Sequence, residues 1–318
     1  MLRALLTGIN GFVGSHLAEY LLQQGDYEIW GVSRSPFIDL ISLRDQVRLV
    51  QADLSDPEAT ARAIIAAQPH VIFHLAGQPF VPESFRDPAA TLATNTLGAL
   101  NIFLTMIAQH IPARVLLVGT YEEYGKILPE DLPINEYAPL RPTNPYGVSK
   151  VAQGILGLQY HLSHGLDVVR VRPFTHIGPR QNERFVTAAF ARQIARIERG
   201  LQPPVMQVGN LSACRDFTDV RDVVRAYTLL MSHGVAGEVY NLGTGHAVMI
   251  RDILDMLLAE STTPIEVHLS ADLMRPIDIP LVTCDARKLR TCTGWAPSMT
   301  IRQTMNDILA YWRGATTV

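Results

Sequence analysis

The stretch TGINGFVG at Thr7–Gly14 decides the fold. A short apolar run at Leu2–Leu6, typical of a buried strand, precedes it, and apolar residues at helical spacing over Ser15–Gln24 follow it. Glycines at GxxGxxG spacing let the backbone turn tightly and approach a pyrophosphate, whose charge lies against the amino terminus of the helix. A strand-to-helix turn without a ligand shares this pattern, but the place of the motif at the start of a β-α unit favours a dinucleotide. The residues expected to contact it are Gly8, Asn10, Gly11, Phe12, Val13 and Gly14.

Short β-rich runs alternate with longer helical patterns as far as Arg172. Several of the runs are apolar throughout, as in strands that are covered on both faces. The sequence therefore predicts an α/β protein with a Rossmann-type, doubly wound parallel sheet. The other expected strands are Glu28–Val32, Val47–Val50, Val71–Leu75, Val115–Val118 and Val168–Val171, and the other expected helices are Pro57–Ala67, Thr91–His110 and Pro145–His164.

Beyond Arg172 the pattern changes to shorter, mixed pieces. We expect a helix near Arg184–Arg199, another at Val220–His233, and a strand at Val239–Leu242 that rejoins the sheet. Two domains with a cleft between them follow from this order. Residues 1–172 with about 218–244 are expected to form the nucleotide-binding domain, and about 173–217 with 245–318 a smaller C-terminal α/β substrate lobe. The smaller strands expected in this lobe are Val205–Val208, Ala213–Phe217 and Pro264–Leu269, and its helices are Val248–Glu260 and Thr300–Trp312.

Composition narrows the class of protein. The chain has 318 residues, a formal net charge of −3 and 47% hydrophobic residues, which gives no electrostatic footprint for nucleic acid and excludes a disordered chain. No run of about 18 apolar residues predicts a membrane span, and the apolar start is too short for a signal peptide. Cys214, Cys284 and Cys292 show no metal-ligand spacing, so we expect a metal-free protein in a reducing cytoplasm.

The end of the second strand selects the dinucleotide. NAD-binding sites usually place an acid there for the ribose hydroxyls, whereas Gly31–Ser35 contains none and offers Arg34 for a 2′-phosphate. This favours NADP(H), with NAD(H) as the alternative if Arg34 is only a solvated surface residue. Asp53 is placed to contact the adenine, and it is equally suited to cap the helix that follows. The residues expected to contact the cofactor after the third and fourth strands are Asp53, Leu54, Leu75, Ala76 and Gly77.

Tyr146 and Lys150 are four residues apart at the start of a predicted helix and therefore share one of its faces. A phenol with a pKa of about 10 is a poor acid–base catalyst at neutral pH, and a neighbouring ammonium stabilises its phenolate. An ordinary amphipathic helix also contains this spacing by chance. Its place after a nucleotide-binding half favours a catalytic pair.

These motifs together resemble the extended short-chain dehydrogenase/reductases that act on nucleotide sugars, and the resemblance covers essentially the whole chain. It is carried by the glycine motif, His74–Gly77, Asn95, Thr120 before Tyr124-Gly125, the tyrosine–lysine pair and Arg215–Val220. Within this group, Glu122–Gly125, Pro145–Lys150 and Arg275-Pro276 are most similar to the GDP-4-keto-6-deoxy-mannose reductases and to their near relatives, the GDP-mannose 4,6-dehydratases.

The resemblance implies an NADPH-dependent oxidoreductase that reduces the 4-keto group of GDP-4-keto-6-deoxy-D-mannose and forms GDP-D-rhamnose. It implies that Tyr146 protonates the carbonyl oxygen while hydride reaches carbon 4, and that Thr120 donates a hydrogen bond to that oxygen. Lys150 would hold the nicotinamide ribose and lower the pKa of Tyr146. Tyr146 and Lys150 would thus serve both the catalytic and the cofactor site.

Glu122 separates the reductase from its alternatives. In the dehydratases a glutamate at this offset removes the proton from sugar carbon 5, whereas in the reductases the carboxylate positions the substrate. Tyr121 stands where serine or aspartate is usual, and the chain is short for a GDP-mannose dehydratase, so the reductase is preferred. The alternatives are a dehydratase or epimerase of nucleotide sugars, and a redox-inactive NADP-binding scaffold, which the presence of Thr120, Tyr146 and Lys150 disfavours.

A GDP-sugar needs cations for its diphosphate, and guanidinium forks match phosphate oxygens. Arg215 and Arg275 match family positions for this role, and Arg180 lies in a loop that can line the cleft. Thr175 stands where relatives carry an asparagine that contacts the substrate phosphates, and His176 beside it is expected to fix the loop by hydrogen bonding. The resemblance also implies a homodimer that pairs through residues 91–110 and 145–164, with no nucleic-acid or membrane partner.

Overall fold

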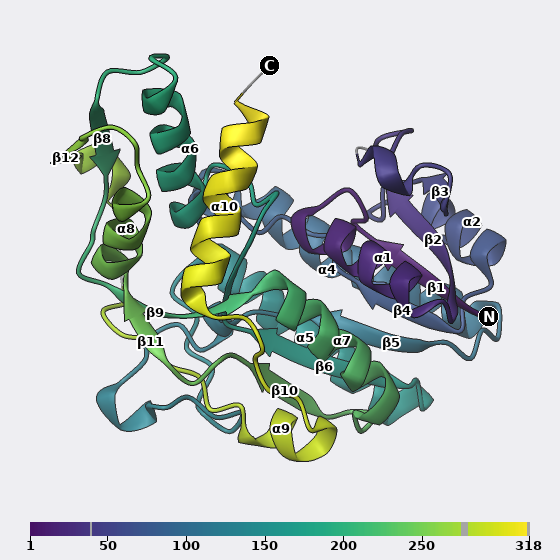
Figure 1. Cartoon of the computed structure of the whole chain (residues 1–318). Helices are drawn as coiled ribbons and strands as arrows, with labels where there is room; N and C mark the ends of the chain where they lie inside the picture. The colour runs from purple at the N-terminus through teal and green to yellow at the C-terminus, as the bar shows by residue number, and fades with distance from the viewer. Residues whose placement is uncertain (39, 275–278, 317–318) are drawn as a thin grey trace.

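The computed structural model describes residues 1–38, 40–274 and 279–316 (Figure 1). Within these ranges the largest feature is a seven-stranded parallel sheet in the order β10-β6-β5-β4-β1-β2-β3. The chain first builds outward from β1 to β3 and then crosses back to β4, and such a reversal opens a crevice for a dinucleotide at the carboxyl ends of the strands. The strands are β1 (Leu2–Thr7), β2 (Tyr27–Ser33), β3 (Val47–Gln51), β4 (Val71–His74), β5 (Arg114–Val118), β6 (Val168–Pro173) and β10 (Val239–Leu242).

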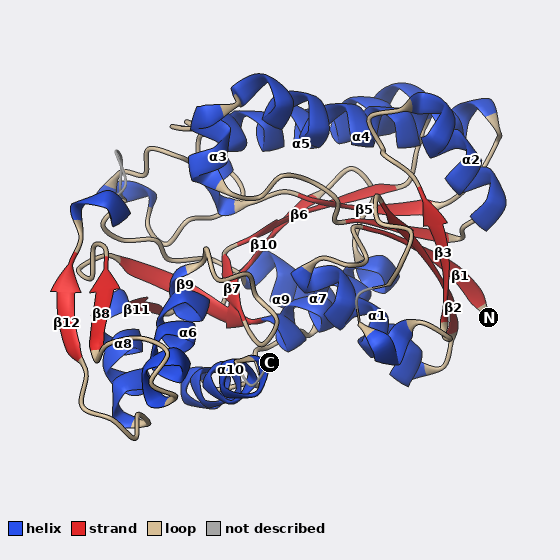
Figure 2. Cartoon of the chain, turned by 90° about the horizontal axis from the view of Figure 1, so that it is seen from above, coloured by secondary structure: helices blue, strands red, loops and turns tan. Residues whose placement is uncertain are grey.

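Helices cover both faces of the large sheet (Figure 2). On one face, buried side chains of α2, α4 and α5 form a core with the strands that includes Phe103 and Leu117. On the other face, α1, α7 and α9 form a second core that includes Leu17 and Val224. These helices are α1 (Phe12–Gln24), α2 (Pro57–Ala67), α4 (Pro88–Ala108), α5 (Pro145–His164), α7 (Val220–His233) and α9 (Arg287–Thr293), with the short α3 (Val81–Arg86) before α4.

A smaller lobe lies beside the carboxyl ends of β6 and β10 and has its own core, which includes Ile194, Leu254 and Ile308 (Figure 2). It contains a three-stranded sheet in the order β11-β9-β7 and a two-stranded sheet of β12 and β8. Its elements are β7 (Thr175–Ile177), α6 (Val186–Glu198), β8 (Val205–Val208), β9 (Cys214–Asp219), β11 (Ala247–Met249), α8 (Ile250–Ala259), β12 (Glu266–Leu269) and α10 (Ile301–Ala315). Short 3-10 turns are η1 (Ile41–Leu43), η2 (Tyr121–Glu123), η3 (Pro129–Asp131) and η4 (Ala271–Leu273).

The predicted α/β, Rossmann-type fold is confirmed, and β10 rejoins the large sheet beside β6 as expected. The predicted start of α4 is three residues late because Asp87 caps the helix, accepting a hydrogen bond from the Ala90 backbone N–H at 2.9 Å. The predictions lack α3, β7, β11 and α9, and the helix expected at Val248–Glu260 begins only at Ile250 because Val248 and Met249 belong to β11. The missing elements are too short to show a helical or strand period in the sequence.

The last part of the chain is divided between the two cores. Leu289 on α9 and the following Trp295 are buried in the core of the large sheet, and the Trp295 indole donates to the Asp222 carbonyl at 2.9 Å. Residues 287–295 fall within 245–318, the range expected for the smaller lobe. The chain therefore returns to the large sheet before α10 enters the lobe.

One described helix, α4, is long and apolar enough to cross a membrane by the criteria of length and hydropathy. Half of its most apolar window is buried inside the protein. Ala99, Ile102 and Met106 of this helix lie in the core under α2 and α5. A core helix of an α/β fold has this composition because its apolar residues cover the sheet.

Candidate active site

The glycine turn brings the start of α1 against the end of β4. Gly8 has a positive φ of 73°, and a Cβ atom there would lie 3.0 Å from the backbone of Ala76. A Cβ atom on Gly14 would lie 2.2 Å from the Gly8 carbonyl oxygen. Only glycine fits these two positions, and the backbone of the turn therefore forms a cradle at the amino terminus of α1.

The same edge of the sheet is held by Thr7 at the end of β1. Its hydroxyl accepts hydrogen bonds from the backbone N–H groups of Leu75 and Ala76, both at 3.1 Å. It also bonds Nδ1 of His74 at 2.9 Å, and burial lowers the pKa of His74 to about 3, so this ring is neutral. The segment expected to contact the ribose and phosphates, Leu75 to Gly77, thus lies directly beside the glycine turn.

The loop after β2 carries the groups expected to select the dinucleotide. The Asn10 amide donates to the Ser33 hydroxyl at 3.2 Å and to the Phe37 carbonyl at 2.8 Å, which ties the glycine turn to this loop. Arg34 is exposed next to Ser33. A guanidinium here is accessible to a phosphate at the end of β2.

The sequence allowed two roles for Asp53, as a cap of the following helix or as a contact with the adenine. The carboxylate of Asp56 caps α2 by accepting from the backbone N–H groups of Glu58 and Ala59. Asp53 instead accepts from the backbone N–H and the hydroxyl of Ser55, and these bonds lower its pKa. Asp53 is therefore not the helix cap, and its contact with the adenine stays a prediction.

The start of α5 places Tyr146 and Lys150. Asn144 caps the helix, and its side chain accepts from the Gly147 backbone N–H at 2.7 Å. Burial raises the pKa of Tyr146, and a side-chain hydrogen bond with Thr120 opposes this rise. Thr120 lies just after β5, at the start of η2. The structure therefore brings together Tyr146 and Thr120, the two residues that the resemblance pairs.

Lys150 is buried one helical turn further along α5. Its ammonium donates to the Val118 carbonyl oxygen and to Oε1 of Gln153, both at 2.8 Å. Burial lowers the pKa of Lys150 to about 8, and the charge of Glu123 opposes this effect. A phenol held by a threonine hydroxyl, with a buried ammonium on the same helix face, is an arrangement that can donate a proton to a carbonyl oxygen.

Glu122 is buried beside this pair. Its Oε2 accepts a hydrogen bond from the Asn144 side chain at 2.9 Å, and its charge contributes to raising the pKa of Tyr146. The structure thus brings together all four residues predicted as catalytic, Thr120, Glu122, Tyr146 and Lys150.

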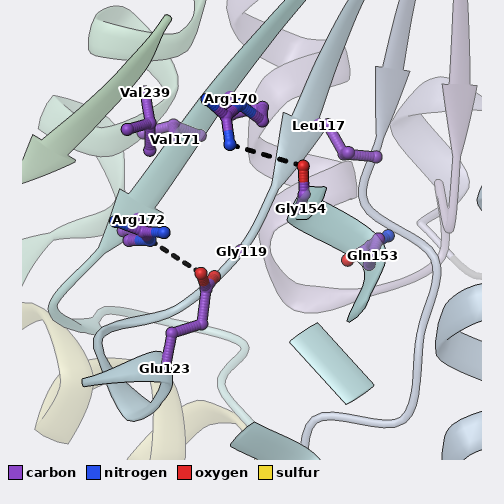
Figure 3. Close-up of a pocket in the computed structure, with 9 residues that line it drawn as sticks. All are labelled: Leu117, Gly119, Glu123, Gln153, Gly154, Arg170, Val171, Arg172 and Val239. Atoms are coloured by element: carbon purple, nitrogen blue, oxygen red, sulfur yellow. Dashed lines mark hydrogen bonds and ion pairs between the residues drawn. The ribbon is translucent and has the colours of Figure 1, made fainter. Parts of the chain in front are cut away.

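Two further residues around this centre are absent from the predicted site. The Asn95 amide donates to the Ser149 hydroxyl at 2.9 Å and its Oδ1 accepts from the Gln78 backbone N–H at 2.7 Å, which joins α4, α5 and the loop after β4. Glu123 is fully enclosed on the far side of Thr120 and lines a small cavity between β5, β6 and α5 (Figure 3). The sequence signal for Glu123 is the pattern Thr-x-x-Glu, which is a capping box.

Two of the residues predicted to bind the substrate, Thr175 and Arg215, lie in the three-stranded sheet of the lobe. Thr175 lies on β7, where it pairs with Phe217 of β9. Arg215 on β9 donates from Nη1 to the carbonyl oxygens of Cys214 and Ile279, at 2.9 and 2.6 Å. Arg275 lies outside the described residues.

Arg180 makes a different contact. Its two terminal nitrogens donate to the two carboxylate oxygens of Glu19 on α1, at 3.0 and 2.6 Å. This bidentate pair links the lobe to the glycine-turn helix. The assignment of Arg180 to the substrate stays a prediction. His176 bonds the Phe174 carbonyl oxygen at 3.2 Å, as expected for a residue that fixes its loop.

The comparison with known proteins agrees with this geometry. The family model described as GDP-mannose 4,6 dehydratase matches residues 5–308. The chain belongs to the GDP-mannose 4,6-dehydratase family. Its relatives in this family include both of the activities weighed from the sequence. The chain is 38% identical over 310 residues to GDP-6-deoxy-D-mannose reductase of Pseudomonas aeruginosa, covering 98% of this chain and 97% of the relative. It is 27% identical over 352 residues to GDP-mannose 4,6-dehydratase of Yersinia enterocolitica, covering 98% and 93%.

Solved structures of related enzymes have the same fold along their whole length. The structure of RMD from Pseudomonas aeruginosa complexed with NADPH has a TM-score of 0.86 and 37% identity, covering 99% of this chain and 100% of that one. UDP-glucose 4-epimerase of Thermus thermophilus complexed with NAD has a TM-score of 0.87 at 28% identity, covering 99% and 100%. The resemblance to nucleotide-sugar dehydrogenase/reductases is confirmed.

Proposed function

We propose that this protein uses NADPH to reduce the 4-keto group of GDP-4-keto-6-deoxy-D-mannose, forming GDP-D-rhamnose. The observation that carries the proposal is the 38% identity to a GDP-6-deoxy-D-mannose reductase over nearly the full length of both chains. Thr120, Tyr146 and Lys150 supply the proton-donating groups that this reaction needs, and they meet in one buried site.

The proposed proton transfer depends on Tyr146 and Lys150, which are both buried. Because burial raises the pKa of Tyr146, its phenol is protonated at neutral pH and can donate to the substrate carbonyl oxygen. The Thr120 hydroxyl positions that oxygen by hydrogen bonding. As the tyrosine loses its proton, the Lys150 ammonium on the same helix face is assigned the role of stabilising the phenolate, since a nearby opposite charge favours the ionised form.

The cofactor site is assigned to the glycine turn and the loops beside it. The positions at Gly8 and Gly14 that a Cβ atom would fill form a cradle that fits a pyrophosphate at the start of α1. We assign the 2′-phosphate of NADPH to Arg34, which is exposed after β2, and Asn10 ties the glycine turn to this loop. An arginine at this place supports NADPH over NADH. When bound, the nicotinamide supplies the hydride. The remaining residues assigned to the cofactor are Gly11, Phe12, Val13, Asp53, Leu54, Leu75, Ala76, Gly77, Tyr146 and Lys150.

The GDP-sugar is assigned to the cleft between the large sheet and the smaller lobe. Arg215 and Arg275 are proposed to hold the diphosphate, since guanidinium groups form paired hydrogen bonds with phosphate oxygens. Thr175 and Arg180 are proposed as further contacts. We propose that the lobe comprises about 173–217 and 245–318, except for residues 287–295, which pack against the large sheet. The proposed nucleotide-binding domain is 1–172 with about 218–244.

A second activity, dehydration of GDP-mannose, is favoured by one observation. Glu122 is buried beside Tyr146 and is held by Asn144, so the site contains a carboxylate of the kind that a base for sugar carbon 5 requires. The reductase remains the proposal because 38% identity to the reductase exceeds 27% identity to the dehydratase. In the reductase, Glu122 positions the sugar.

One assay separates the two activities. The enzyme is supplied with GDP-mannose alone, or with its 4-keto-6-deoxy product and NADPH, while the absorbance of the reduced cofactor and the products are followed. We expect net consumption of NADPH with the keto sugar and formation of GDP-D-rhamnose. Conversion of GDP-mannose without net change of the cofactor would overturn the reductase proposal in favour of the dehydratase.

We also propose a cytoplasmic homodimer. The three cysteines are free, which suits a reducing compartment. Exposed apolar side chains lie on the outer faces of α4 and α5, among them Leu97, Leu104, Ile155 and Leu162, and such a face suits a second copy of the chain. Sedimentation of the purified protein tests this, and a monomer at micromolar concentration would contradict it.

A further inference from the structure

Glu123 is a buried carboxylate for which the proposed reaction has no direct use. Only 2% of the residue is exposed. Its Oε1 accepts a hydrogen bond from the Thr120 backbone N–H at 3.0 Å, and its Oε2 accepts from Nε of Arg172 at 2.6 Å. Both oxygens act as acceptors, which is the pattern of an ionised carboxylate. Burial raises the pKa of Glu123 and the Arg172 guanidinium opposes the rise.

The backbone around Glu123 leaves room for this carboxylate. A Cβ atom on Gly119 would lie 2.1 Å from Oε1 of Glu123, and one on Gly154 of α5 would lie 3.7 Å from Oε2. Figure 3 shows the carboxylate directed from the segment after β5 toward Arg172 on β6, with Gln153 of α5 lining the same cavity. The carboxylate is thus enclosed between the catalytic segment, the sheet and the catalytic helix.

Arg172 is itself held in place. Its Nη1 donates to the Tyr124 hydroxyl at 3.2 Å, and its guanidinium lies 5.0 Å from the centre of the Tyr124 ring. The Tyr124 hydroxyl donates in turn to Oδ1 of Asn241 on β10 at 2.7 Å. The ion pair is therefore anchored to two strands of the large sheet, and Glu123 has little freedom to change position.

Among the described residues, the acceptors that the Lys150 ammonium contacts directly are neutral. These are the carbonyl oxygen of Val118 and the amide oxygen of Gln153. Glu123 is the charged group that opposes the effect of burial on the pKa of Lys150. The titratable and charged groups around Glu123 and Lys150 are His74 on β4, Glu123 and Tyr124 after β5, Tyr146 on α5, and Arg170 and Arg172 on β6.

We propose that Glu123, held by Arg172, is a positioning residue that fixes Thr120 through its backbone and supplies the buried negative charge facing Lys150. This role rests on the proposed reductase activity, in which Thr120 and the Lys150 ammonium serve Tyr146. Glu122 and Glu123 then have separate tasks. Glu122 is held by Asn144 at the start of the catalytic helix, and Glu123 holds the Thr120 backbone and acts on Lys150 through its charge.

The charges around Lys150 and Tyr146 predict in which direction the pH dependence of activity moves when Glu123 loses its charge. Without the carboxylate, burial alone acts on Lys150 and its pKa falls further below its usual value. The charge of Glu123 also contributes to raising the pKa of Tyr146, so its removal lowers that pKa as well. Reduction needs a protonated tyrosine and a protonated lysine, and both changes move the loss of activity at high pH toward lower pH.

The first test is the pH profile of kcat/KM for Glu123→Gln. We expect its alkaline limb to move to lower pH by about 1 unit, together with a fall in kcat. The matched control is Glu198→Gln, which breaks a bidentate carboxylate–guanidinium pair with Arg313 in the smaller lobe. The control is expected to leave the limb in place. An unmoved limb in Glu123→Gln, or an equal shift in the control, would overturn the proposal.

The second test observes Lys150 directly and needs no substrate. The chain has three lysines, Lys126, Lys150 and Lys288, so ¹³Cε labelling of lysine gives three NMR signals, which lysine-to-arginine variants assign. We expect the titration midpoint of Lys150 to fall in Glu123→Gln while those of Lys126 and Lys288 stay constant. An unchanged Lys150 midpoint would overturn the proposed charge effect.

A double variant covers the case in which Glu123→Gln alone does not fold, because it leaves Arg172 buried without its partner. Glu123→Gln with Arg172→Gln removes both charges, and we expect the Lys150 midpoint to fall here too, since Glu123 is the charged group that raises the pKa of Lys150. A Lys150 midpoint at the wild-type value would overturn the inference. If the wild type does not consume NADPH with the keto sugar, the proposed function fails, while the lysine titration still decides the role of Glu123.

Discussion

The catalytic edge of the large sheet and the smaller lobe hold their charged groups in different ways. Tyr146 and Lys150 lie one turn apart on a single helix whose start is fixed by Asn144, and Thr120 follows the neighbouring strand. In the lobe, Arg215 donates to backbone carbonyls and Arg180 to Glu19 on α1. The first set depends on local helix geometry, and the second on which segments the tertiary fold brings into reach.

This difference predicts which substitutions affect chemistry and which affect binding. Residues at the sheet edge should alter kcat because they contact the reacting atoms. Residues of the lobe should alter KM, because the interactions of a diphosphate clamp are the same in the bound substrate and in the transition state.

The largest effect is expected for Tyr146→Phe. Removal of the hydroxyl takes away the proton donor but keeps the ring, so we expect kcat to fall by about 10²–10⁴-fold, with a much smaller loss of NADPH affinity. Steady-state turnover and fluorescence titration of NADPH measure the two effects. Turnover at the wild-type rate would contradict a catalytic role of Tyr146. It would instead support the alternative of a redox-inactive cofactor-binding scaffold.

Arg215→Ala should raise the KM for the GDP-sugar by about 10-fold, because one charge-assisted contact with the diphosphate is lost. We expect kcat to change less than KM. The control is Arg287→Ala, since Arg287 is an exposed arginine paired with Asp285. A fall in kcat at constant KM would show that Arg215 acts with the catalytic residues at the sheet edge. It would contradict the proposed difference between the sheet edge and the lobe.

Arg34→Ala tests the loop after β2. We expect the preference for NADPH over NADH to fall by about 10-fold, since the 2′-phosphate loses one guanidinium. Binding constants for both cofactors measure it. Equal weakening for NADPH and NADH would remove Arg34 from the phosphate site.

The smallest effect is expected for Arg180→Ala. Its pair with Glu19 is partly exposed, so its loss should lower the free energy of unfolding by about 1 kcal/mol or less. Denaturant unfolding measures this. A rise in KM for the GDP-sugar without loss of stability would instead support the substrate contact predicted from the sequence.

Much of the fold and part of the site are readable from the sequence. The glycine motif and the apolar strands predict the parallel sheet, because each β-α unit is a local pattern. Tyr146 and Lys150 are predictable as a pair because four residues is a helical repeat. The short elements β7 and α9 are not, since they are held in place by distant partners such as β9 and the core around Trp295.

Glu122 and Glu123 show which features of the site the sequence alone predicts and which ones only the tertiary structure determines. By itself, the sequence determined that a carboxylate would stand near the catalytic tyrosine, and the resemblance pointed to Glu122. Only the tertiary structure decided that Glu123 pairs with Arg172 while Glu122 pairs with Asn144, because Arg172 is 49 residues distant from Glu123 and lies on the strand beside β5. Side chains of neighbouring residues point in different directions, and the segments that enclose them are set by long-range packing.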